Sequence, residues 1–190
     1  MSWDEIANNI NFNLEVDYEQ LADFVSRNHK IADLGCGYGR VVSELVSLGY
    51  SDVVGIDPSK NMIDRGKREF PSLSLSHWKE TNFDTLHETF DAVLVCAVLT
   101  VITDSEKRYE FVNTICSILK PGGIVYLVEF CAENERVFMS GIGMEMRYST
   151  PSEYCALFRT FKTLKSNVFQ CSTIGGTKEM GFSAIFRKCS

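Results

Sequence analysis

The chain has 190 residues, of which 45% are hydrophobic and 23% charged, and its net charge is −6. This composition is typical of one compact domain and excludes a disordered chain. No apolar run reaches the ~18 residues that cross a bilayer, and the acidic start Met1–Glu5 differs from a secretory signal. The acidic balance also argues against general attraction to nucleic acid. We therefore expect a single cytoplasmic domain over residues 1–190.

Residues 1–29 are predicted to form a helical lead before the first strand. Five later apolar runs are rich in β-branched residues and lack the polar alternation of half-exposed strands. These runs are Lys30–Leu34, Asp52–Ile56, Leu73–Trp78, Phe90–Cys96 and Ile124–Phe130. Segments with helical periodicity separate them, which predicts βα units around a parallel sheet.

Capping and turn residues predict four helices and a final hairpin. The first helix is Arg40–Leu48, which ends before Gly49, and the second runs from Ser59 to about Glu69. The third begins at the capping box Thr103–Glu106 and runs to about Leu119. The fourth begins at the capping box Thr150–Glu153 and has Tyr154, Leu157, Phe158 and Phe161 on one face. The tail is predicted as two antiparallel strands, about 163–173 and 181–187, joined at Gly175-Gly176. Such a hairpin would close one edge of the sheet.

The segment with the strongest functional signal is Asp33-Leu-Gly-Cys-Gly-Tyr-Gly39, which joins the first strand to a helix. Its glycines allow a sharp turn and a close approach of a ligand to the main chain. A dinucleotide-binding loop would need glycine where Arg40 stands, and an apolar residue is usual in the place of Asp33. The second strand leads to Asp57, 20 residues after Gly37. A carboxylate there either accepts from a ribose diol or caps the turn that follows.

The pattern D-x-G-x-G-x-G at Asp33–Gly39 resembles the first motif of class I S-adenosylmethionine-dependent methyltransferases. Phe90–Cys96 is similar to the fourth-strand segment of that family, and Leu119–Tyr126 to the turn that enters its fifth strand. Over about residues 31–152, the resemblance implies an α/β fold with a three-layer Rossmann-like sheet. Its strand order would be 3-2-1-4-5-7-6 with strand 7 antiparallel, in agreement with the hairpin predicted for the tail.

The resemblance implies that the cofactor is S-adenosylmethionine, with S-adenosylhomocysteine as the product. The glycine loop would enclose its methionine part, Asp33 would accept from its amino group and Asp57 from its ribose. For the adenine contact after the third strand, one alignment selects Glu80–Thr81 and is preferred, and the other selects Asn82–Phe83. The expected cofactor-binding residues are Asp33, Gly35, Cys36, Gly37, Gly39, Arg40, Asp57, Pro58, Met62, Glu80, Thr81 and Cys96.

The expected catalytic residues follow from the position of the acceptor beyond the fourth and fifth strands. Methyl transfer from a sulfonium is an in-line displacement, so the protein mainly supplies alignment and a dry site. Family members that act on small molecules often carry histidine near position 100 or 101, where this chain has Thr100 and Val101. We therefore consider Glu129, as an acid or as a supporting group, and Arg147 with Tyr148, as groups that meet a polar or anionic acceptor.

The resemblance also implies that residues 1–29 and an insert at residues 131–149 cover the acceptor. In the insert, Met139, Met144 and Met146 would form an adjustable wall, and Arg147 either binds the acceptor or is solvated. The seven cysteines include no C-x-x-C pair. Reduced thiols are therefore expected, and no metal site is.

These patterns predict an S-adenosylmethionine-dependent methyltransferase that acts on an unidentified small molecule, as a monomer or a homodimer. No Pro-Pro-Tyr segment, which methyltransferases of exocyclic amines carry, follows the fourth strand, and the chain has no basic module to recruit a polyanion. Two alternatives stay open. One is a non-catalytic S-adenosylmethionine-binding partner subunit or sensor, and the other is a methyltransferase that acts on a protein or RNA.

Overall fold

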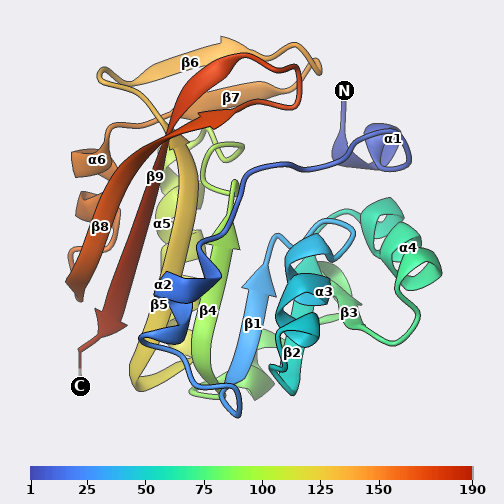
Figure 1. Ribbon diagram of the computed structural model, residues 1–190, viewed down its shortest axis with the longest axis vertical. Helices are drawn as coiled ribbons and strands as arrows, with labels where there is room; N and C mark the ends of the chain where they lie inside the picture. Colours follow the sequence, from blue (N-terminus) through green and yellow to red (C-terminus); the bar gives the residue numbers. More distant parts are fainter. Residues whose placement is uncertain (190) are drawn as a thin grey trace.

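The computed structural model describes residues 1–189 and contains a seven-stranded sheet in the order β3-β2-β1-β4-β5-β9-β8 (Figure 1). Its strands are β1 (Lys30–Leu34), β2 (Asp52–Asp57), β3 (Ser74–His77), β4 (Phe90–Cys96), β5 (Leu119–Cys131), β8 (Phe161–Ser172) and β9 (Lys178–Lys188). β9 is antiparallel to both of its neighbours, and the other adjacent pairs are parallel. The predicted α/β class and strand order are confirmed, with β9 as the antiparallel seventh strand.

Helices cover both faces of this sheet and give it three layers (Figure 1). The core on one face includes residues of α2 (Tyr18–Ala22), α3 (Arg40–Ser47) and α4 (Lys60–Glu69), and the other core includes α5 (Ser105–Ile118) and α6 (Pro151–Leu157). Along β4, Ala92 and Leu94 enter the first core, and Val93 and Val95 enter the second, because strand side chains alternate. Within residues 1–189, no helix has both the length and the apolar character needed to cross a membrane.

Capping residues start the helices close to their predicted positions, with one correction. Ser59 caps α4 and Thr150 caps α6, as the sequence predicts. The cap of α5 is Asp104, whose carboxylate accepts from the Lys107 amide at 3.0 Å, and not Thr103. An ionised cap also interacts favourably with the helix dipole, which explains the preference for the aspartate.

Residues 131–161 depart most from the predicted elements. α6 ends at Leu157, and Phe161 begins β8 instead of continuing the helical face, although it still packs against Phe158. The insert contains a second hairpin, formed by β6 (Arg136–Met139) and β7 (Glu145–Tyr148). This hairpin lies beyond the carboxyl end of β5, at the top of the view in Figure 1.

The first 16 residues form a strap across the carboxyl ends of the strands and not a continuous helical lead (Figure 1). α1 (Trp3–Ile6) is a single turn, and the chain then stays non-helical up to α2. Arg65 of α4, which is buried, donates to the carbonyl oxygens of Ala7 (2.8 Å) and Ile10 (2.5 Å). These carbonyls therefore bond to a guanidinium and not to helical amides. We call residues 1–16 the N-terminal strap.

Arg65→Met should loosen the N-terminal strap, because two buried carbonyls lose a charged donor. We expect a loss of about 1–3 kcal/mol in the free energy of unfolding, measured by urea unfolding, and faster limited proteolysis within the strap. Arg68→Met is the matched control, since Arg68 bonds to Asn8 at an exposed position. Equal losses in the two variants would contradict the role given to Arg65.

Candidate functional site

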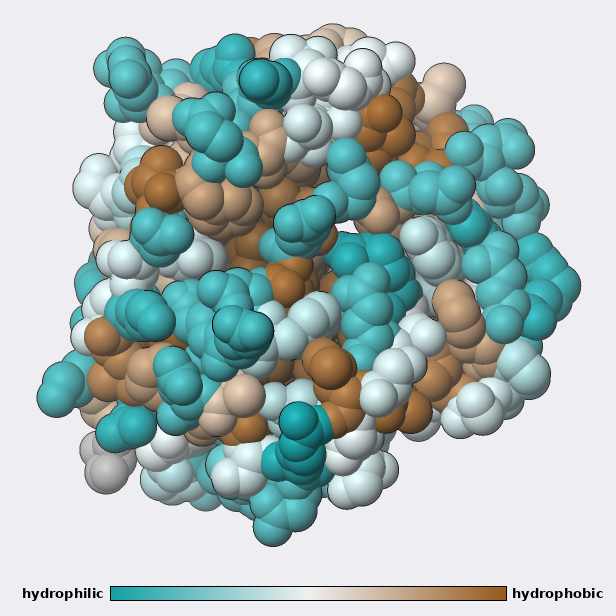
Figure 2. All heavy atoms as spheres, viewed as in Figure 1, coloured by the Kyte–Doolittle hydropathy of each residue, from teal (hydrophilic) through white to brown (hydrophobic). Residues whose placement is uncertain are grey.

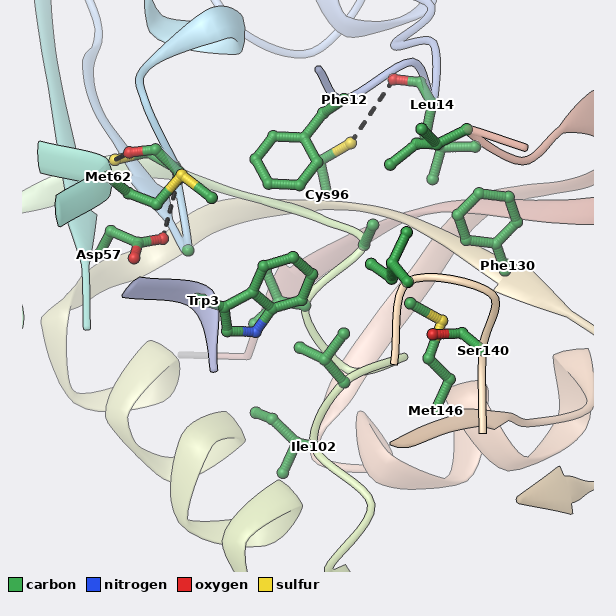
Figure 3. A pocket seen from close by; sticks show the side chains of 18 of the residues that line it. Trp3, Phe12, Leu14, Asp57, Met62, Cys96, Ile102, Phe130, Ser140 and Met146 are labelled. Atoms are coloured by element: carbon green, nitrogen blue, oxygen red, sulfur yellow. Dashed lines mark hydrogen bonds between the residues drawn. The ribbon is translucent and has the colours of Figure 1, made fainter. Parts of the chain in front are cut away.

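A cavity of about 770 Å³ lies at the carboxyl ends of β1, β2 and β4, and residues of the N-terminal strap form part of its wall. The space-filling view shows this face hollowed, with hydrophobic side chains in the wall of the hollow (Figure 2). Asp57 and Met62 lie at one end of the cavity, which we call the β2 end (Figure 3). Phe130 and Met146 lie at the other end, which we call the β5 end, and Cys96 lies between the two ends. Ligands of open α/β sheets bind at this edge.

Gly35 and Gly37 bring the main chain to the surface of the cavity. Their φ angles are +76° and +56°, in the region that favours glycine. A Cβ atom at Gly35 would lie 2.4 Å from Val98, and one at Gly37 would lie 2.5 Å from Phe12. A larger residue at either position would strain the turn and push the neighbouring wall away.

Asp57 ties the end of β2 to the glycine loop. One carboxylate oxygen accepts from the Gly37 amide at 2.8 Å, and the other accepts from the Ser59 amide at 2.7 Å. Burial raises the pKa of this carboxyl, and the two amides oppose that shift. Each oxygen keeps further acceptor capacity. Asp57 therefore caps the turn and still presents an acceptor to the cavity that it lines.

Asp33, at the end of β1, lines the same cavity with an unsatisfied carboxylate. The residue is 1% exposed, and its Oδ2 atom has no hydrogen-bond partner among residues 1–189. Burial raises the pKa of this carboxyl to about 7, and the charge of Arg40 opposes the shift. A buried acceptor without a donor is costly. A cationic donor in the cavity would satisfy it, so the residue fits the amino group expected there.

Nine of the twelve predicted cofactor-binding residues line the cavity: Asp33, Gly35, Cys36, Gly37, Arg40, Asp57, Pro58, Met62 and Cys96. Gly39 does not. It caps α3 with a φ of +88°, and a Cβ atom there would lie 3.0 Å from Leu75. Its role in the loop is therefore to start the helix and to allow close packing on β3.

The residues predicted to contact adenine after β3 lie outside this cavity. Glu80, at the end of the 3-10 turn η1 (Trp78–Glu80), and Thr81 line a separate hollow beside Leu86. The alternative pair Asn82–Phe83 also lies outside, with Asn82 as the cap of the 3-10 turn η2 (Phe83–Leu86). Trp78, from the same segment, does line the cavity.

Of the three catalytic candidates, Tyr148 alone lines the cavity. It is stacked on Phe130, with ring centroids 5.4 Å apart. Arg147 is engaged elsewhere, since its guanidinium donates to Glu135 at 2.6 and 2.9 Å. Glu129 is fully buried, and both of its oxygens accept from the chain between β4 and α5. The acceptor contact expected of Arg147 and the acid role expected of Glu129 are therefore not supported.

Three walls of the cavity come from segments in which sequence analysis singled out few residues. The strap supplies Trp3, Phe12, Asn13 and Leu14. The β6–β7 hairpin supplies Phe138, Ser140, Gly141, Ile142 and Met146. The turn between β8 and β9 supplies Thr173, Ile174, Gly175 and Thr177, and the start of β9 supplies Glu179. Met139, expected in the wall, is 66% exposed, and Met144 does not line the cavity either. Asn13 joins two of these walls by donating to the carbonyls of Ser172 and Thr173. No local motif marks these segments, which meet through tertiary contacts.

Comparison with known proteins identifies a family for just under half of the chain. Residues 31–123 match the family described as methyltransferase domain. An uncharacterized methyltransferase from Oceanobacillus iheyensis is 28% identical over 110 residues, covering 57% of this chain and 51% of that protein. The human mitochondrial ubiquinone biosynthesis O-methyltransferase is 36% identical over 110 residues, covering 52% of this chain and 28% of that protein. This chain thus spans about half or less of the length of these relatives.

Solved structures share the fold over most of the chain. An S-adenosylmethionine-dependent methyltransferase from Methanosarcina mazei has a TM-score of 0.79 at 24% identity, covering 90% of this chain and 98% of that one. The 1,6-didemethyltoxoflavin-N1-methyltransferase of Burkholderia thailandensis has a TM-score of 0.69 at 17% identity, covering 91% of this chain and 75% of that one. At these identities, the likeness establishes the Rossmann-like methyltransferase fold.

Asp33→Asn should change how the stability of the ligand-free protein depends on pH. The pKa of Asp33 is about 7 in the folded chain, against about 3.9 in an unfolded one. Between these values the folded state holds the extra proton, so stability falls as the pH rises through this window. We expect wild type to lose about 3 kcal/mol more than the variant between pH 4.5 and 7.5 in urea unfolding.

Asp64→Asn serves as a control for this experiment, because Asp64 forms an exposed ion pair with Lys60. It should keep the wild-type pH dependence. If the free energy of unfolding depended on pH in the same way in wild type and in Asp33→Asn, the raised pKa of Asp33 would be contradicted.

Proposed function

We propose that this chain, whose residues 31–123 match a methyltransferase domain and whose fold is that of S-adenosylmethionine-dependent methyltransferases, transfers the methyl group of S-adenosylmethionine to a small, largely apolar molecule. The observation that carries the proposal is a cavity that joins the carboxylates of Asp33 and Asp57 to an aromatic chamber at the β5 end. Its volume of about 770 Å³ falls in the upper range of small-molecule sites. That space suits a cofactor with an acceptor beside it.

The β2 end offers a suitable partner for each part of S-adenosylmethionine. The unpartnered oxygen of Asp33 suits the amino group, and the loop Gly35–Gly37 allows the methionine part to approach the main chain. The acceptor capacity of Asp57 suits the ribose hydroxyls, and Trp78 and Met62 give apolar surface for the adenine ring. When bound, the cofactor supplies a methyl group already activated on a sulfonium. The chain therefore has to bind, orient and shield the reactants.

The β5 end suits a flat apolar acceptor. Phe130 and Tyr148 are nearly parallel, with an interplanar angle of 9°, and Phe138 meets Tyr148 edge-on at 4.9 Å. Met146 and Ile174 line the cavity as well. Aromatic and thioether surfaces of this kind stabilise planar ligands through stacking and edge contacts.

Two polar groups at this end suit a hydroxyl or carbonyl substituent on the acceptor. Burial raises the pKa of Tyr148 to about 12, so its hydroxyl stays protonated at neutral pH and serves as a donor. Glu179, which lines the cavity, forms an ion pair with Arg136 at 2.8 Å. The guanidinium of Arg136 also lies over the Tyr148 ring, 5.0 Å from its centroid. This pairing keeps the carboxylate of Glu179 from standing as an isolated charge.

The chain contributes alignment and the exclusion of water to this reaction. The strap and the β8–β9 turn are joined by Asn13, and Met1 packs beside Gly143 in the turn between β6 and β7. The segments that cover the cavity are thus held to one another. With an acceptor oxygen that has already lost its proton, the sulfonium and the oxyanion neutralise each other as the methyl group moves, so a site shielded from water favours the transition state.

The names of similar proteins support an acceptor of this class. The human relative is an O-methyltransferase of ubiquinone biosynthesis, and the Burkholderia structure contains 1,6-didemethyltoxoflavin together with S-adenosylhomocysteine. The net charge of −6 also favours a small acceptor over RNA.

Calorimetric titration should detect binding of S-adenosylmethionine and S-adenosylhomocysteine. Asp57→Ala should weaken the binding of S-adenosylhomocysteine roughly 10- to 100-fold, because it removes an acceptor for the ribose and releases the Gly37 amide. Asp52→Ala changes an exposed acid at the start of the same strand and should leave the affinity unchanged. Tight binding of NAD without binding of S-adenosylmethionine would overturn the proposed cofactor.

The acceptor class is tested by the formation of S-adenosylhomocysteine with small phenols and quinols, with RNA oligonucleotides and with protein extracts. We expect turnover with members of the first group. Tyr148→Phe keeps the aromatic ring and loses the hydroxyl, so it should raise the acceptor KM about 3- to 10-fold and leave the affinity for S-adenosylhomocysteine unchanged.

Tyr109→Phe, at an exposed position, is the control for Tyr148→Phe. Turnover with RNA or protein alone would contradict a small acceptor. Binding of S-adenosylmethionine without turnover in any of the three groups would favour a sensor or a partner subunit.

A further inference from the structure

Glu129 is a buried carboxylate that binds the connection between β4 and α5, residues 97–104. One oxygen accepts from the amides of Val98 (2.9 Å) and Leu99 (2.8 Å), and the other accepts from the amide (3.0 Å) and the hydroxyl (2.7 Å) of Thr100. The residue is 0% exposed. A carboxylate suits this position because it accepts several hydrogen bonds and brings no donor of its own.

Arg108 of α5 holds the same connection through its carbonyl side. Its guanidinium donates to the Leu99 carbonyl at 3.2 Å and to the Ser149 hydroxyl at 2.8 Å, and the residue is almost fully buried. The charges of Arg108 and Glu129 both act on Tyr154, so the two buried ions lie in the same part of the core. Such an arrangement avoids an isolated buried charge.

On one side, this connection supports the glycine loop. Ala97 has a φ of +57°, which residues with a side chain rarely adopt. The next residue, Val98, packs so closely on Gly35 that a Cβ atom there would lie 2.4 Å from its Cγ2 atom. Ala97, Val98 and Gly35 all line the cavity. The bonds to Glu129 begin at Val98 and hold this conformation in place.

On its other side, the connection carries the β6–β7 hairpin. The Thr100 carbonyl accepts from the Arg147 amide at 2.8 Å, and the Thr103 carbonyl accepts from the Arg147 guanidinium at 3.1 Å. Met146 and Tyr148, which flank Arg147 in β7, line the cavity. Arg147 therefore anchors the wall whose neighbouring residues face the acceptor.

We propose that Glu129 is a positioning residue for methyl transfer, because it fixes the acceptor wall on β7 relative to the glycine loop. This inference rests on the proposed function. Thr100, which Glu129 holds through two hydrogen bonds, is the link between the two sides. An in-line displacement needs its reacting atoms held in near-attack geometry. A glutamine at position 129 would turn its amide NH2 group toward donors that now meet an oxygen, and would release both the glycine loop and β7.

The test compares Glu129→Gln with Asp91→Asn. Asp91 also accepts from a main-chain amide, that of Lys30 at 2.8 Å, and from Lys120 at 2.7 Å, but it lies at the opposite end of β4. Amide hydrogen exchange is measured with and without S-adenosylhomocysteine. In wild type and Asp91→Asn, we expect the ligand to slow exchange at residues 98–100 and 145–148. In Glu129→Gln, these segments should exchange at least about tenfold faster without ligand, and the ligand should no longer slow exchange at 145–148.

Turnover gives a second measurement that a purely structural role would not move. We expect Glu129→Gln to lower kcat by a larger factor than it raises the acceptor KM, and to weaken S-adenosylhomocysteine binding about tenfold. Thr100→Ser keeps the hydroxyl bond to Glu129, so its kcat, acceptor KM and affinity for S-adenosylhomocysteine should match those of wild type. Thr100→Val loses this bond, so the same three quantities should change in the direction expected for Glu129→Gln. If Glu129→Gln does not fold, the comparison of Thr100→Ser with Thr100→Val tests the same proposal.

Persistent protection of residues 145–148 by S-adenosylhomocysteine in Glu129→Gln would overturn the proposal, even in a less stable variant. A wild-type protein that does not bind S-adenosylhomocysteine would overturn the proposed function. In that case, exchange at the Arg147 amide of the ligand-free variants still decides whether Glu129 joins the glycine loop to β7.

Discussion

The site depends on the parallel pairing of β1 with β2, in which Asp33 lies opposite Gly55. Because both strands end at the same edge of the sheet, the loop that leaves β1 meets the acid that leaves β2, and Asp57 accepts from the Gly37 amide. Gly55 is part of this constraint, since a Cβ atom there would lie 2.7 Å from Leu75. A side chain at Gly55 would displace its neighbours and, with them, the two carboxylates that face the cavity.

The glycine loop, Asp57 and the central strands are predictable because a local sequence signal determines each of them. The alternating glycines and the acid at the end of an apolar strand identified the loop and Asp57, and the apolar runs identified the central strands. The segment after β3 has no such signal: two alignments fitted it, and neither revealed the 3-10 turn at whose end Glu80 lines a separate hollow. Trp78, from the same segment, lines the cavity.

The catalytic candidates show what a sequence cannot supply, namely the partner of a side chain. Glu129 does follow β5 toward the correct edge of the sheet, but main-chain amides from residues 98–100 occupy its carboxylate. Arg147 likewise bonds to Glu135 and to the chain before α5. The strap, the β6–β7 hairpin and the β8–β9 turn come together through contacts such as that of Asn13 with Thr173. Contacts between residues so far apart along the chain leave no periodic pattern in the sequence.

Both tryptophans of the chain, Trp3 and Trp78, line the cavity. They come from segments far apart in the sequence, Trp3 beside Phe12 in the strap and Trp78 against Phe83 after β3. The intrinsic indole fluorescence of the described chain therefore arises from the walls of this cavity, without a contribution from a distant tryptophan. The protein consequently carries its own optical reporter, in which a change of emission reports an event within the cavity.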